Sequence, residues 1–233
     1  MRVIILLGLN FVRTQWIVLA IITAYLLGMG GVFRGRVYQA DVLFFLRWHA
    51  GYAVFLAAMA AIPALQMERK TRRVLAVLSK GIHRWQYLAG LLCGCALMAA
   101  LFCLLVGCIA GWLSQQGGLG DNGLLPVTIA LFCCSIAAAA TGLFFSTFLH
   151  PFLAMAATSA FLFLPIALET LGRSPLWQAF PVAWIFHFLF KFQLQPAGSE
   201  VWEIAAAALL QSVVLWLAAA LIFARRDVTI APE

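Results

Sequence analysis

The sequence predicts an all-α polytopic membrane protein with six transmembrane helices. Of the 233 residues, 65% are hydrophobic and only 10% are charged, whereas a soluble domain is nearer half apolar and a quarter charged. A spanning helix needs about 20 mostly apolar residues. Nearly the whole length is used by the spans, so we expect a single transmembrane domain. The six candidate spans are residues 16–33, 51–66, 86–113, 124–149, 152–171 and 201–224.

The connecting segments divide into surface, loop and broken stretches. Residues 1–15 are too short to span and contain Asn10 and Arg13, which favours an amphipathic helix at the membrane surface. Residues 34–48 carry several charges and are expected to form a loop that lies partly in the interface. Within residues 172–200, an apolar stretch is broken by Pro181. Such a stretch, too short to span, predicts a re-entrant hairpin shielded by protein or by a water-filled cavity.

The distribution of Lys and Arg predicts the orientation. If the N-terminus is inside, ten of these residues lie on the cytoplasmic side and five on the outer side. Cytoplasmic loops are enriched in positive charge, so we expect both termini in the cytoplasm and the hairpin of residues 172–200 on the outer face. The net charge of +7 is then explained by these loops and by lipid headgroups, without a nucleic-acid partner.

Residues 68–85, between the second and third spans, carry six of the fifteen Lys and Arg residues. One interpretation is a positively charged cytoplasmic loop with an aromatic anchor. The other is a short helix that docks on a soluble partner, because Val74, Leu75 and Leu78 share one helical face. Gly81 would end this helix before the third span begins.

The stretch "MERKTRRVLAVLSKGIHRWQYLAGLL" resembles ABC transporter permeases of the type-2 (O-antigen-exporter-like) family. The family shows an acidic residue, a Thr a few positions on, a short helix with paired Leu, and a run into a long third span. This sequence has Gly81 where the family usually has Pro. The matching residues are Glu68, Thr71, Leu75, Leu78 and the run Ile82-His83-Arg84.

The resemblance extends to the layout of a surface helix, six spans, cytoplasmic termini and an outer broken segment. It implies that residues 68–85 form a cytoplasmic coupling helix that receives the stroke of a separate ATP-binding subunit. It also implies an exporter with two permease subunits, identical or different, in a bacterial inner membrane. The residues expected to contact the ATP-binding subunit are Glu68, Arg69, Thr71, Arg72, Val74, Leu75, Leu78, His83 and Arg84.

The chain itself is not expected to be an enzyme or to bind a cofactor. A phosphate-binding loop requires G-x-x-x-x-G-K-[ST], but none of the three lysines follows a glycine. ATP and Mg²⁺ would therefore be held by the partner subunit. The apolar, aromatic walls favour an amphipathic or lipid-like substrate, and membrane lipids are the remaining expected partners. Candidate residues of the pathway or outer gate are Glu169, Phe180, Pro181 and Trp184.

Several features have simpler interpretations. Glu169 can pair with Arg173 four residues later on a helix. Gly90 and Gly94 are expected to pack helices within one subunit. The six cysteines lie in apolar runs and are expected to pack as small hydrophobes, so no metal site is predicted. Two other functions stay open, namely a secondary transporter and a non-transporting membrane anchor of a redox or assembly complex.

Overall fold

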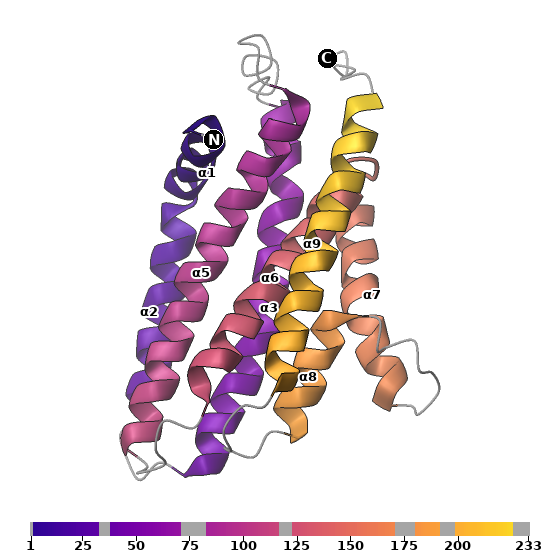
Figure 1. Ribbon diagram of the computed structural model, residues 1–233. Helices are drawn as coiled ribbons and strands as arrows, with labels where there is room; N and C mark the ends of the chain where they lie inside the picture. Colours follow the sequence, from indigo (N-terminus) through magenta and orange to yellow (C-terminus); the bar gives the residue numbers. More distant parts are fainter. Residues whose placement is uncertain are drawn as a thin grey trace.

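A computed structural model describes residues 2–32, 38–70, 83–116, 123–170, 180–191 and 199–225. This part of the chain is all-helical, with no strand, and most of its helices run along one axis (Figure 1). The predicted all-α class is therefore confirmed for the described residues. The helices are α1 (Arg2–Thr14), α2 (Trp16–Val32), α3 (Gln39–Lys70), α5 (Arg84–Gln116), α6 (Leu124–Ser146), α7 (Pro151–Thr170), α8 (Pro181–Lys191) and α9 (Ser199–Arg225).

Four of the described helices are long and apolar enough to cross a membrane. They are α5, α6, α9 and the segment Ala40–Gln66 of α3. Helices α1 and α2, bent by 65° at their junction, make a fifth if the pair is counted as one span. Helix α7 contains a shorter apolar stretch, Pro151–Pro165. An integral membrane protein is thus supported, and the arrangement with six spans stays a prediction.

Helix α3 begins earlier than the sequence analysis expected. The predicted loop, residues 34–48, is already helical from Gln39 onward. The backbone N–H of Tyr38 donates to Asp41 Oδ2 over 2.9 Å, which satisfies a group that the helix start leaves unpaired. No Gly or Pro interrupts residues 39–50. Phe45 and Leu46 of this stretch are buried in the core, so tertiary packing extends the helix beyond the predicted span of residues 51–66.

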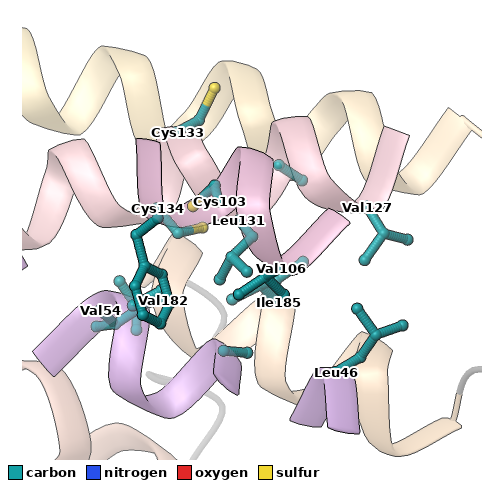
Figure 2. Close-up of a cluster of buried hydrophobic side chains, with 14 of the residues drawn as sticks. Leu46, Val54, Cys103, Val106, Val127, Leu131, Cys133, Cys134, Val182 and Ile185 are labelled. Atoms are coloured by element: carbon teal, nitrogen blue, oxygen red, sulfur yellow. The ribbon is translucent and has the colours of Figure 1, made fainter. Parts of the chain in front are cut away.

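Helix α6 is the central helix of the bundle. In its apolar window, 72% of the residues are buried, against 28% in α9. Small side chains from Ser135 to Gly142 allow its neighbours to approach closely. Figure 2 shows part of the resulting core, with side chains of α3, α5, α6 and α8. They include Leu46 and Val54 of α3, Cys103 and Val106 of α5, Val127, Leu131, Cys133 and Cys134 of α6, and Val182 and Ile185 of α8.

Several Ser and Thr hydroxyl groups within the helices bond to their own backbone. Each donates to a carbonyl three or four residues earlier, which is how a buried Ser or Thr can avoid an unpaired polar atom in an apolar environment. These side chains therefore need no partner on another helix. The donors include Thr23, Thr128, Ser135, Thr141 and Ser212, with donor–acceptor distances of 2.7 to 2.9 Å.

The closest approach of α6 to α3 yields a testable prediction. A Cβ added at Gly142 would lie 2.8 Å from the carbonyl oxygen of Ala58. This is a backbone atom, so it cannot relieve the clash by a change of side-chain rotamer. We expect Gly142→Ala to lower the stability of the bundle by about 1–3 kcal/mol, as overpacking does. The measurement is the thermal unfolding midpoint in detergent. Gly111→Ala is the matched control, because a Cβ there meets nothing within 4 Å. Equal midpoints for the two variants would contradict this packing.

Candidate functional site

Four parts of the chain come together at one end of the bundle, which we call the α1 end. They are α1, the last turn of α3, the first turn of α5 and the last turn of α9 (Figure 1). Residues 68–85 begin in α3 and finish in α5, so both ends of the predicted docking segment are found here. The centre of the segment, residues 71–82, lies outside the described residues.

The structure describes part of the predicted set of partner contacts. Glu68 and Arg69 belong to the last turn of α3 by their backbone, and their side chains are not described. His83 directly precedes α5, and Arg84 is its first residue. The other predicted contacts lie outside the described residues, namely Thr71, Arg72, Val74, Leu75 and Leu78.

Arg84 has an intramolecular role that the sequence analysis missed. Its Nη1 donates to the carbonyl oxygens of Phe223 and Ala224, over 3.0 and 3.1 Å. The last carbonyls of a helix lack intrahelical partners, and a cation near them is favourable. The guanidinium carbon also lies 6.0 Å from the centre of the Phe223 ring. Arg84 therefore joins the start of α5 to the end of α9, a contact that we call the Arg84 link.

Aromatic side chains reinforce the Arg84 link. The rings of Trp85 and Trp216 meet edge to face, with their centres 6.3 Å apart. The buried ring of Tyr87 stacks against Phe223 at 6.4 Å. Such pairs contribute beyond the area that they bury. The first turn of α5 and the last turns of α9 consequently behave as one packed unit.

The start of α5 also contains a local cap. The backbone N–H of His83 donates to Gln86 Oε1 over 3.2 Å. This is half of a capping box, in which the side chain of the third helical residue accepts a hydrogen bond from the backbone N–H of the residue that precedes the helix. A Gln at that position was visible in the sequence, so this cap could have been predicted. The Arg84 link could not, because it joins residues 139 and 140 positions apart.

The end of α3 has a link of its own. Gln66 Nε2 donates to the carbonyl oxygen of Leu149 over 3.2 Å. Leu149 lies in the turn between α6 and α7, and its own N–H donates to the Phe145 carbonyl over 2.9 Å. We call the first contact the Gln66 link. No role for Gln66 was predicted from the sequence. The only feature of Gln66 that stands out in the sequence is a polar amide side chain at the end of an apolar run.

Helix α1 packs directly against α5. A Cβ added at Gly90 or Gly94 would lie 2.7 Å from a carbon of Leu7 or Phe11, respectively. These two glycines therefore allow α1 to lie close, which confirms the prediction that they pack helices within one chain. The opposite side of α1 exposes Ile5, Leu6 and Leu9, as expected of a helix that faces lipid on one side.

The second group of predicted residues lies at the start of α8. The Phe180 ring contacts that of Phe161 of α7, with centres 5.0 Å apart. The carbonyl oxygen of Pro181 accepts a hydrogen bond from Cys134 Sγ of α6 at 3.6 Å. Trp184 is half-buried, and its Nε1 finds no hydrogen-bond partner among the described residues. Phe180, Pro181 and Trp184 thus lie in or directly before the first turn of α8, and their role in a pathway stays a prediction.

These contacts locate the start of α8 along the bundle. Cys134 and Phe161 are near the middle of α6 and of α7, so α8 begins about halfway between the two ends. Figure 1 shows α8 in the half away from α1, beside the first turns of α9. The fourth predicted pathway residue, Glu169, lies in the last turns of α7, and its side chain is not described.

No metal centre is evident in the part of the chain that the structure describes. It holds no group of three or more His, Cys, Asp or Glu side chains able to bind an ion. The six cysteines form no disulfide, and four of them, Cys95, Cys103, Cys133 and Cys134, are buried. This agrees with packing as small hydrophobes. That the chain binds no metal or cofactor stays a prediction.

The Arg84 link gives a second testable prediction. We expect Arg84→Gln to weaken the attachment of the end of α9 by roughly 1–2 kcal/mol, because hydrogen bonds from a charged donor are lost. Amide hydrogen exchange of residues 219–225 should accelerate. Arg13→Gln is the control, since it removes an exposed cation of α1 without touching α9. Unchanged exchange in the Arg84 variant would show that the link does not hold α9.

Comparisons with known proteins do not supply a family for this chain. No model of a known protein family matches it, and no curated protein matches its sequence.

Proposed function

We propose that the chain is the transmembrane permease subunit of an ATP-driven ABC exporter. The observation that carries the proposal is the motif resemblance of residues 67–92, which connect two long apolar helices, α3 and α5. The arrangement of the α1 end is compatible with it, because both ends of that segment lie beside α1 and the end of α9. A docking surface for a large soluble partner needs several segments close together at one end of the bundle.

In this proposal, ATP and Mg²⁺ are bound by a separate subunit that docks on residues 68–85 at the cytoplasmic face. When two such subunits close on ATP, they press on the coupling segments of two permease chains. The pathway between the chains then alternates between inward and outward access by rigid-body motion of helices. The second permease, identical or different, completes the pathway, since one chain forms only part of it.

The orientation belongs to the same proposal. Both termini are cytoplasmic and the membrane is a bacterial inner membrane, supported by the ten-to-five distribution of Lys and Arg. Residues 172–200 form the outer re-entrant segment. Its support is that α8 starts halfway along the bundle and has only 11 residues. Pro181, Val182 and Ala183 are buried, which is compatible with the shielding by protein that a re-entrant segment requires.

The substrate that suits this chain is amphipathic or lipid-like. The described helices contain few charged side chains between their ends, and their walls are rich in Phe, Leu and Ala. A hydrophilic ion would find few charged or polar groups to replace its water there. Export of a strongly charged, hydrophilic compound would therefore contradict the substrate class and leave the ATP-driven mechanism to be judged separately.

Docking of an ATPase is tested by changing the expected apolar face. We expect Leu75→Asp with Leu78→Asp to release an ATP-binding subunit that co-purifies with the wild-type chain, because two charges would enter an apolar contact. Co-purification, and ATP hydrolysis by the complex, are measured in detergent. Membrane insertion of the variant should stay normal.

The matched control is Ala76→Asp. It adds a charge on the opposite side of the expected helix and should retain the partner. If the double variant keeps its ATPase and its turnover, residues 68–85 are not the coupling segment. If the wild-type chain binds no ATPase at all, the exporter proposal fails. Transport that continues without ATP but stops when an ion gradient is dissipated would favour a secondary transporter.

A further inference from the structure

The two links at the α1 end lead to different parts of the bundle. The Arg84 link joins the start of α5 to the end of α9. The Gln66 link joins the end of α3 to the turn between α6 and α7. Residues 71–82, outside the described part of the chain, connect α3 to α5. The two links therefore tie the two ends of that connection to different helices.

From the Gln66 link, a continuous series of contacts extends to α8. Leu149, whose carbonyl accepts from Gln66, donates its N–H to the Phe145 carbonyl over 2.9 Å. The Phe145 ring lies 6.0 Å from that of Phe161, and Phe161 lies 5.0 Å from Phe180. Both pairs are edge to face, within the range of favourable aromatic contacts. We call Phe145, Phe161 and Phe180 the aromatic series.

The last member of the series sits where α8 begins. Phe180 is followed by Pro181, whose ring restricts the backbone and whose carbonyl is held by Cys134. The backbone N–H groups of Ala183 and Trp184 donate to the Phe180 carbonyl over 3.0 and 3.3 Å. Phe180 thus contacts α7 through its ring and the first turn of α8 through its carbonyl. Close-packed interiors transmit small shifts because they contain few voids to absorb them.

We propose that Gln66 and the aromatic series mechanically connect the α1 end to the start of α8. Gln66 acts as a positioning residue, since it holds the α6–α7 turn against the end of α3. Phe161 acts as the spacer between that turn and Phe180. The inference rests on the proposed function for its purpose, which is to let a partner at the α1 end move the re-entrant segment. The connection itself is a property of this chain alone.

The Arg84 link provides the contrast. Trp85, Tyr87, Trp216 and Phe223 pack around it, so several contacts hold the start of α5 to the end of α9. A displacement of the α1 end can then shift α3 and the α6–α7 turn relative to this packed unit. Packed side chains and hydrogen bonds with two arrangements are the means by which distant sites are coupled. Among the described residues, the aromatic series leads to α8 from the Gln66 side, whereas the Arg84 link lies at the opposite end of α9 from the turns beside α8.

The experiment measures amide hydrogen exchange of residues 180–191 in the full-length chain, reconstituted in lipid nanodiscs without any partner. Gln66→Met removes the hydrogen-bond donor and nearly preserves the shape. We expect it to accelerate exchange in α8 about fivefold, the equivalent of losing one net hydrogen bond. Phe161→Ala should do the same. The double variant should not exceed either single change, because coupled sites are not additive.

Four further variants make the result specific. Gln66→Lys keeps a donor that reaches a carbonyl and should restore slow exchange. Gln211→Met removes a half-buried amide of α9 whose oxygen has no partner among the described residues, and should leave α8 unchanged. Phe152→Ala removes an exposed ring of α7 and should also have no effect. Arg84→Gln should accelerate exchange at the end of α9 and leave α8 slow.

Phe161→Leu replaces Phe161→Ala if the latter does not fold. Unchanged exchange of α8 in both Gln66→Met and the Phe161 variant would overturn the connection. Equal acceleration in Gln211→Met and Phe152→Ala would overturn it too, because the effect would then be a general loosening. These outcomes do not depend on an ATPase, so they are separate from failure of the exporter proposal, which is judged by co-purification.

Discussion

The close approach of α6 to α3 is the constraint on which the other contacts depend. Gly142 has room for hydrogen only, because the carbonyl of Ala58 lies where a Cβ would be. With α3 that close, the end of α3 reaches the α6–α7 turn, and Gln66 can donate to Leu149. In lipid, helices gain little from burying apolar surface alone, so such close backbone approach is a main source of association.

A second constraint comes from unpaired backbone groups. An irregular segment inside a membrane is tolerated only where protein or water satisfies it. The start of α8 meets this requirement by burial among α3, α6 and α7, and by the hydrogen bond from Cys134 to Pro181. The same burial brings Phe180 against Phe161. The start of α8 is therefore held by contacts from several neighbouring helices.

The end of the bundle nearest α1 combines rigid and adjustable contacts. Arg84 binds two terminal carbonyls of α9, with aromatic rings packed around it, so several contacts must be lost together before α5 and α9 separate. Gln66 makes one neutral hydrogen bond to a turn, which is worth much less. A segment attached through both the Arg84 link and the Gln66 link would move more easily at its α3 end than at its α5 end. This asymmetry follows from bond type and burial, independently of any partner.

The sequence by itself determined the membrane character, the helical class and the positions of most long apolar helices, because hydrophobicity and length act locally. It also pointed to Gly90 and Gly94 as packing positions and to Pro181 as a break. Only the tertiary structure decided that α3 begins at Gln39, that Arg84 contacts α9 and that Gln66 contacts the α6–α7 turn. The two links join groups 83 or more positions apart in the chain. Local periodicity carries no information about which carbonyl a distant side chain will reach once the helices have packed.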